Sequence, residues 1–541
     1  MHLATTAPAT EPRPAPLSSR LGAAIEVASV LAALGASQLS AALVAPSSAP
    51  FQAVADTVVR LSPAGLIEFG KTLELPALGL AKGVADKAGL LVGIGAVLLL
   101  GAVLAGAAAR RRPLPGRLLI ALFGAVGLAA VLGSPVFAPP DLVAPVVAAT
   151  VGLGVFGRLY AAATRTAASP DTGGPPRVPD RRRVLRGIAV AGLGGIGAAA
   201  AGVAFGGGAL GGGATRSRDA LRGRITPTRP ALALPPDADF ASAGTPTFLT
   251  ANRDFYRIDT ALRIPRLTAA DWSMRVHGLV DEELRLSYDE LLAQPLLEKT
   301  ITMTCVSNEV NGNLVSTANF TGVSLRELLL RAGVRPGADQ IFSTSVDGWS
   351  AGTPTDVVLR ADSDALLAIG MNGEPLPAEH GFPVRMVVPG LYGFVSATKW
   401  VVDLELTTFD AKQAYWPRRG WARRAPIKTQ SRVDRPRSFE TLARGPAGTV
   451  TLAGIAWAQQ RGIDRVEVRL DERGPWLPAR LSTQVNLSTW RMWRLDLALA
   501  PGSHFVQCRA TDATGATQAA EPTSPIPDGA AGRPGIRFEV S

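Results

Sequence analysis

The chain has 541 residues, enough for three or four domains of ordinary size, and its apolar fraction of 47% with only 18% charged residues excludes a wholly soluble protein. The net charge is +11, but most of the excess lies in the apolar first 213 residues, so no basic folded domain is available to bind nucleic acid. The 2 cysteines and 4 histidines of the chain are too few for zinc ribbons, iron-sulfur clusters or a disulfide scaffold.

Five apolar stretches follow one another in the first part of the chain, at 21–45, 89–109, 118–133, 142–163 and 187–209. Each is long enough, or nearly so, to cross about 30 Å of hydrocarbon. Arginines cluster before the first stretch, between the second and third, and between the fourth and fifth, which places them on one side if every stretch crosses once. The positive-inside rule makes that side cytoplasmic. We therefore predict a multi-pass domain over 1–213 in the plasma (inner) membrane, with a cytoplasmic N-terminus and an extracytoplasmic remainder.

The fifth stretch has a signature of its own. Arg181, Arg182 and Arg183 precede a weakly hydrophobic segment rich in Gly and Ala. This resembles an internal twin-arginine export signal, of the kind that passes folded, cofactor-loaded domains, and ordinary positive-inside charge is the alternative. No histidine falls inside an apolar stretch, so the bundle lacks the paired axial ligands of a membrane haem. We expect Glu26 at the cytoplasmic interface and interpret the bundle as an anchor or docking surface.

The rest of the chain divides into segments that differ in composition and in hydrophobic pattern. Residues 214–250 are rich in Gly, Pro, Ala and Thr without a sustained period, which predicts a linker. Val-rich runs and the amphipathic FTGVSLRELLLRAGV, which ends in a Gly stop, predict an α+β domain over 251–425. Short alternating strands over 440–541 predict an immunoglobulin-like sandwich. The predicted fold class is therefore multi-domain, with a transmembrane helix bundle, an α+β domain and an all-β sandwich.

Cys305 directly follows the strand-like run KTITMT and opens a polar loop that contains glycine. A thiolate at such a junction can bind a soft transition metal. A lone cysteine is also a common small core residue, and a disulfide with Cys508 is a third possibility outside the cytoplasm. Spacing alone leaves these three open. Cys508 itself stands in an alternating strand, which predicts a buried core position.

Two further segments carry candidate binding groups. In MNGEPLPAEHGFPVRMVVPGLYGFVSATKW, His380 and Arg385 offer donors for a phosphate or a heterocycle, and GLYGFVSATK offers small residues, hydroxyls and a lysine to an anion. A solvated turn between two strands is the alternative. The segment ANRDFYRIDTALRIP mixes Asn, aromatic residues and Arg, which is also compatible with a surface strand.

At these residues the chain resembles the sulfite oxidase family of molybdopterin enzymes. The Thr-Cys-Val-Ser-Asn-Glu loop, the Phe-Thr-Gly-Val-Ser-Leu segment and the MNGEP to ATKW stretch occur in the family's order within 250–541. The resemblance implies that Cys305 binds the molybdenum of a molybdopterin cofactor and that the C-terminal sandwich is a dimerisation domain. It implies that the pterin and its phosphate are held by Asn252, Phe255, Tyr256, Arg257, His380, Arg385, Gly393, Ser396, Thr398 and Lys399.

Two positions depart from the sulfite-oxidising members of the family. Those enzymes have an Arg a few residues after the metal-bound Cys and a Tyr before the Met-Asn-Gly run, where this chain has Val310 and Ile369. A dianionic substrate would lose a cation and a hydrogen-bond donor, so sulfite is not the expected substrate. Arg257 remains as a catalytic anion contact, and Trp349 is a candidate wall of the pocket.

We therefore predict a membrane-anchored molybdenum oxidoreductase that carries out two-electron oxygen-atom transfer on a small molecule at the extracytoplasmic face. The alternatives are a reductase of sulfoxides or N-oxides, including methionine sulfoxide, that is fed by a membrane electron carrier, and a non-catalytic binding or scaffold protein. The chain has no Cys-x-x-Cys-His and no nucleotide fingerprint, so we expect no haem, flavin or NAD. Expected partners are a separate electron carrier (a cytochrome, a quinone-linked protein or a soluble carrier) and a second copy of the chain through the C-terminal domain.

Overall fold

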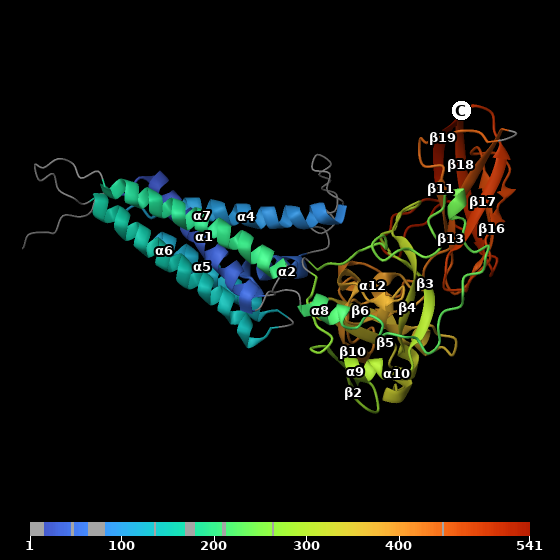
Figure 1. Ribbon diagram of the computed structural model, residues 1–541, viewed down its shortest axis with the longest axis horizontal. Coiled ribbons are helices and arrows are strands. Elements are labelled where there is room, and N and C mark those ends of the chain that lie inside the picture. Colours follow the sequence, from blue (N-terminus) through green and yellow to red (C-terminus); the bar gives the residue numbers. More distant parts are fainter. Residues whose placement is uncertain are drawn as a thin grey trace, which may run out of the picture. The chain divides into compact units, whose positions relative to one another are not determined.

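The computed structural model divides the chain into two compact units, Met1–Gly212 with Ala261–Arg263, and Gly213–Thr260 with Ile264–Ser541. The first unit is helical and the second is built mainly of sheets (Figure 1). The structure describes residues 16–44, 48–62, 82–134, 137–167, 179–207, 213–261, 264–445 and 448–541.

The first unit contains long apolar helices. Its helices are α1 (Ser19–Val44), α2 (Pro50–Leu61), α4 (Lys82–Ala108), α5 (Leu114–Leu132), α6 (Val143–Ala167) and α7 (Pro179–Gly207). Five stretches are long and apolar enough to cross a membrane, namely Ser19–Val44, Gly89–Ala108, Leu114–Leu132, Pro139–Arg165 and Arg182–Ala204. They correspond to the five stretches found in the sequence, whereas the short α2 was not among them.

Helix α1 packs against α4, α6 and α7 through glycines. A Cβ atom added to Gly35 would lie 2.1 Å from the carbonyl oxygen of Gly195 in α7, and one added to Gly22 would lie 2.2 Å from that of Gly106 in α4. Only residues without a side chain permit such close approach of helix backbones. The small residues that make these helices weakly hydrophobic therefore have a packing role.

Glu26 lies in α1 and is fully buried inside this bundle. Both of its carboxylate oxygens are without a hydrogen-bond partner among the described residues. A Cβ atom added to Gly116 of α5 would lie only 2.4 Å from its Oε2 atom. Glycines of the neighbouring helices therefore let them close over the Glu26 side chain, and its position at the cytoplasmic interface stays a prediction.

The α+β part of the second unit contains two sheets. The first has the strand order β2-β1-β10-β5-β6, and the second has the order β3-β4-β7-β8 with β9 paired to β7. The strands of the first are β1 (Ser273–Gly278), β2 (Leu284–Ser287), β5 (Gln340–Ser345), β6 (Ser350–Pro354) and β10 (Val401–Thr407). Those of the second are β3 (Leu297–Thr304), β4 (Val315–Ser324), β7 (Leu366–Met371), β8 (Glu374–Pro375) and β9 (Arg385–Val387).

Short helices connect these strands: α9 (Tyr288–Leu292), α10 (Leu325–Ala332), α11 (Thr355–Leu359) and α12 (Gly393–Ser396). The predicted amphipathic helix is α10, but the first residues of the predicted segment belong to β4. Its start is fixed by the Ser324 side chain, which accepts a hydrogen bond from the Glu327 N–H, and its end by Gly333 at φ +66°.

The C-terminal part is all-β, with two sheets of order β11-β13-β17-β16 and β12-β19-β18-β14-β15. Its own core includes Val466, Trp493, Cys508 and Phe538. An all-β domain agrees with the prediction, and an immunoglobulin type of topology stays a prediction. The strands are β11 (Gln430–Arg435), β12 (Thr441–Leu442), β13 (Thr449–Trp457), β14 (Ile463–Arg469), β15 (Leu477–Pro478), β16 (Arg480–Leu481), β17 (Arg491–Ala498), β18 (Gly502–Asp512) and β19 (Gly535–Val540).

The segment 214–250 packs onto this second unit instead of forming a free tether. It begins in α8 (Gly213–Asp219), where the Arg218 guanidinium donates to the Glu374 carboxylate at 2.9 Å. Leu221, Phe240 and Phe248 are buried in the core of the unit. Apolar residues spaced along a Pro- and Ala-rich sequence give no helical or strand period, but they still anchor an irregular chain.

Candidate cofactor site

Cys305 comes directly after β3 and is 8% exposed. Its N–H donates to the Leu314 carbonyl at 2.9 Å, and its carbonyl accepts from the Asn308 N–H at 3.1 Å. Both cysteines are free thiols, so the considered disulfide with Cys508 is not formed. Cys508 is fully buried in the C-terminal core, which confirms its predicted position, and burial raises the pKa of its thiol to about 12.

His380 and Arg385 form a buried pair of binding groups. The Nε2 atom of His380 lies 3.1 Å from the Asn252 carbonyl oxygen, and Nη1 of Arg385 donates to the His380 carbonyl at 3.1 Å. Because a carbonyl can only accept, Nε2 carries the proton and Nδ1 is an acceptor. Burial, followed by the charges of Arg385 and Lys399, lowers the pKa of His380 to about 3, so the ring is neutral at physiological pH.

Aromatic rings join this pair to the segment around Asn252. The Phe255 ring stacks on Tyr256 at 5.4 Å and meets the His380 ring edge-on at 5.4 Å. The Arg385 guanidinium lies 5.7 Å from the centre of the Phe320 ring. Burial raises the pKa of the Tyr256 hydroxyl, Cys305 raises it further and Arg385 lowers it, so these three groups share one electrostatic environment. The structure thus brings together residues from three segments that are distant in sequence.

Lys399 and Arg257 meet at a carboxylate that the sequence did not single out. The Lys399 ammonium donates to the Glu379 carbonyl at 2.9 Å and to Asp259 at 3.2 Å, and Nε of Arg257 donates to the same carboxylate at 3.0 Å. Burial lowers the pKa of Lys399 to about 8, against the effect of Asp259. The sequence did contain a signal for this residue. Asp259 stands two residues after Arg257, in a segment that the family resemblance implies to bind an anion.

The remaining predicted residues of the glycine-containing loop use their hydroxyls within the protein. Ser396 donates to the carbonyls of Leu391 and Tyr392, and the Thr398 hydroxyl pairs with that of Ser343 at 2.7 Å. Gly393 begins α12, and a Cβ atom added there would lie 3.7 Å from the Tyr256 hydroxyl. Contact of these three residues with a cofactor stays a prediction.

Trp349 lies in the turn between β5 and β6, where its N–H donates to the Asp347 carboxylate at 3.1 Å. Burial raises the pKa of Asp347, and the nearby charge of Asp259 raises it further. This turn is therefore close to the Lys399 end of the site. Of the two departures from the family pattern, Ile369 is fully buried in β7 and Val310 is half-buried beside the 522–532 segment.

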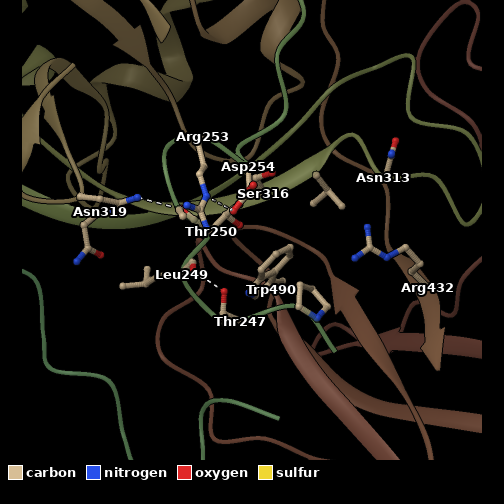
Figure 2. Close-up of a pocket in the computed structure, with 14 residues that line it drawn as sticks. Thr247, Leu249, Thr250, Arg253, Asp254, Asn313, Ser316, Asn319, Arg432 and Trp490 are labelled. Atoms are coloured by element: carbon tan, nitrogen blue, oxygen red, sulfur yellow. Dashed lines mark hydrogen bonds and ion pairs between the residues drawn. The ribbon is translucent and has the colours of Figure 1, made fainter. Parts of the chain in front are cut away.

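A pocket of about 770 Å³ lies where the segment 246–254 and β4 face the C-terminal part. Figure 2 shows Arg253, Asp254 and Ser316 on one side of it and Arg432 on the other. It borders the Cys305 loop, because Val315 of its lining pairs with Thr304. The lining combines apolar side chains with neutral amides and hydroxyls and a few charged groups, and neither its amides nor Arg432 were among the predicted residues; it comprises Pro246, Thr247, Leu249, Thr250, Ala251, Arg253, Asp254, Asn313, Val315, Ser316, Asn319, Asn372, Arg432 and Trp490.

Unpaired buried atoms show what kind of group this part of the fold is built to bind. Nδ1 of His380 and Nε of Arg385 are both buried and without a hydrogen-bond partner among the described residues. Such groups destabilise a protein unless a ligand or water pairs with them. One free acceptor, one free donor, two more cations and a soft cysteine sulfur fit an anionic heterocycle that carries a metal.

Comparisons with known proteins also point to a domain that binds a metal-carrying heterocycle. The profile of the oxidoreductase molybdopterin binding domain matches residues 261–416, and that of the Mo-co oxidoreductase dimerisation domain matches residues 424–526. Human mitochondrial sulfite oxidase is 28% identical over 317 residues, covering 50% of this chain and 57% of that protein. The chain therefore spans little more than half of that relative.

Two further proteins extend the comparison. The uncharacterized oxidoreductase YuiH of Bacillus subtilis is 35% identical over 150 residues, which cover 28% of this chain and 72% of that protein. The crystal structure of the sulfane dehydrogenase SoxCD from Paracoccus pantotrophus is 24% identical with a TM-score of 0.45, covering 56% of this chain and 83% of that chain. The chain belongs to the sulfite oxidase family of molybdopterin-dependent oxidoreductases.

Proposed function

We propose that this molybdenum oxidoreductase is anchored in the membrane, faces the extracytoplasmic space and transfers an oxygen atom to or from a small molecule in a two-electron reaction. The observation that carries the proposal is the buried cluster around Cys305, in which His380 and Arg385 keep an acceptor and a donor unpaired. Five apolar helices support the anchor. The cofactor, when bound, supplies the metal that exchanges oxygen and electrons.

Each group of the cluster has a definite task in this proposal. Cys305 holds the metal as a thiolate. The neutral His380 ring accepts an N–H at Nδ1, and Arg385 donates from Nε, which together orient a heterocycle. Lys399 and Arg257 neutralise its anionic end. Cys305, His380 and Arg385 are buried and the Lys399 side chain is only 11% exposed, which limits competition from water and strengthens their interactions.

The pocket beside Cys305 supports a neutral or larger substrate. Its volume of about 770 Å³ exceeds what a small oxyanion needs. Its arginines are already paired, Arg432 with Asp434 at 2.7 Å and Arg253 with Asp254 at 3.4 Å. A reductase of sulfoxides or N-oxides, including methionine sulfoxide, is the second candidate, since such neutral groups accept hydrogen bonds from uncharged donors.

We expect sulfite to be a poor substrate. Val310 and Ile369 replace two polar side chains with groups that cannot donate a hydrogen bond. Losing one charge-assisted hydrogen bond costs about 1.5 to 3 kcal/mol, or roughly 10-fold to 150-fold in kcat/KM. The measurement is steady-state kinetics of the purified full chain with sulfite and with a panel of sulfoxides, N-oxides and neutral thioethers, using artificial donors and acceptors.

A double variant gives this experiment its internal control. Val310→Arg with Ile369→Tyr restores the two polar groups and should raise kcat/KM for sulfite relative to the neutral compounds. Sulfite turnover by the unmodified chain that equals its best alternative substrate would contradict the prediction and point to Arg257 or another cation.

Replacing Arg181, Arg182 and Arg183 by Lys tests the proposed export route. If these residues form a twin-arginine signal, the first four helices should still insert while the catalytic domain stays inside, because Lys keeps the charge but not the signal. Protease protection of the catalytic domain in spheroplasts reports the outcome. Unchanged export would leave the arginines with a role in topology only.

The proposed partners are a separate electron carrier and a second copy of the chain. The homodimer is supported by the dimerisation-domain match over residues 424–526. The carrier could be a cytochrome, a quinone-linked protein or a soluble protein, and the chain is proposed to contain no haem or flavin of its own.

A further inference from the structure

Asp259 holds two cations of the cofactor site on one carboxylate. The distances from its Oδ2 atom are 3.0 Å to Nε of Arg257 and 3.2 Å to Nζ of Lys399. The exposed fraction of its side chain is 6%, and that of Lys399 is 11%. Ion pairs as buried as this one are more strongly coupled than surface pairs, because water screens them less.

The surroundings of Lys399 make its charge depend on that carboxylate. Arg257, Arg385 and the neutral His380 ring lie on its side of the site, and Asp347 lies close enough to interact with Asp259. The Trp400 ring centre is 5.5 Å from the ammonium. Burial and both arginines favour the neutral amine, whereas Asp259 favours the ammonium.

The described contacts leave donors available on both cations. The Lys399 ammonium has three N–H groups and uses two of them, on Asp259 and the Glu379 carbonyl. Arg257 uses its Nε on Asp259 and retains its two terminal nitrogens. A carboxylate that occupies one N–H of each side chain fixes both while leaving the rest to bind an anion.

We propose that Asp259 is a positioning residue of the cofactor site, which keeps Lys399 charged and holds Lys399 and Arg257 in place for the anionic end of the cofactor. The inference rests on the proposed cofactor role of these residues. It assigns to an acid a part in binding an anion, which the charge of its own side chain would oppose. The favourable effect is indirect and passes through the two cations.

The test compares Asp259→Asn with Asp259→Glu in the purified full chain. Molybdenum and pterin per polypeptide are measured after dialysis at about pH 5 and about pH 7, both below the Lys399 pKa of about 8, so that the unmodified chain keeps the ammonium at both values. Without Asp259 that pKa falls further, and a lysine is charged below its pKa and neutral above it. We expect Asp259→Asn to retain about tenfold less cofactor than the unmodified chain at the higher pH, with a smaller loss at the lower pH. Asp259→Glu should restore most of the retention.

Two controls separate this role from a purely structural one. Asp410→Asn removes a surface ion pair with Arg423 and should leave cofactor retention unchanged at both pH values. Lys399→Gln should lower retention equally at both values, because it has no charge to lose, and it serves as the readout if Asp259→Asn does not fold.

The outcomes distinguish this inference from the proposed function. Retention by Asp259→Asn that matches the unmodified chain, or a loss that does not change with pH, would overturn the role of Asp259 alone. An unmodified chain that purifies without molybdenum after expression with an active cofactor supply would overturn the proposed function itself.

Discussion

Cys305→Ser should abolish turnover and remove the bound molybdenum while leaving the fold largely intact. Serine offers hard, mostly protonated oxygen, which is a poor substitute for thiolate on a soft metal. The backbone bonds of Cys305 to Leu314 and Asn308 are independent of its side chain and should persist. Turnover with artificial donors and acceptors, metal analysis and far-UV circular dichroism report the three effects.

The second cysteine supplies the matched control. Cys508→Ala should lose stability by about 1 kcal/mol, because it leaves a small gap in the C-terminal core. It should lose no molybdenum, since the Cys508 thiol contacts the Ser431 hydroxyl at 3.2 Å inside that core. Full activity in Cys305→Ser would contradict the ligand assignment.

Gly381→Ala should deplete the cofactor as severely as loss of a binding residue. Gly381 has φ +110°, and a Cβ atom there would lie 3.0 Å from Cβ of Arg385 and 3.2 Å from Cα of Lys399. An alanine therefore strains the backbone and also forces two cofactor-binding residues apart. Backbone strain alone costs about 1 to 3 kcal/mol of the free energy of unfolding, and the cofactor loss comes from the displaced Arg385 and Lys399. Cofactor content measures the effect of displacing Arg385 and Lys399, and thermal unfolding of the apoprotein measures the backbone strain.

Gly373→Ala is the corresponding control, because it isolates the backbone effect. Gly373 has φ +76°, but no atom lies within 4 Å of an added Cβ. It should destabilise the chain to a similar degree while leaving most of the cofactor bound. Equal cofactor loss in both variants would show that strain, and not the spacing of Arg385 and Lys399, controls binding.

Hydropathy predicts the helices of the first unit well because the length of an apolar run decides whether it can span a bilayer. The burial of Glu26 was not predictable in the same way. Its burial depends on Gly116 and on other glycines of neighbouring helices, and sequence does not reveal which faces meet. The same limit applies to Leu221 and Phe248, whose core positions follow from tertiary packing and not from any local period.

Motif order pointed to residues that the structure brings together, whereas the charge partners among them were missed. Spacing alone left Cys305 as ligand, core residue or disulfide, and only the structure excludes the third. Asp259 escaped notice because an acid in an anion site looks unfavourable until its two cations are placed around it. Arg432 escaped notice because it reaches the pocket from the C-terminal part, far away in sequence.

The packed segment 213–250 decides where a soluble form of the enzyme has to begin. A fragment that starts at residue 251 would lack Leu221, Phe240 and Phe248, which belong to the core of the catalytic domain. Burying one such side chain stabilises a protein by about 1.5 to 3 kcal/mol, so losing three approaches the whole stability of a typical domain. A fragment cut at the Pro- and Gly-rich boundary suggested by composition would therefore expose apolar surface and aggregate, whereas one that begins at or before Gly213 keeps its own core complete.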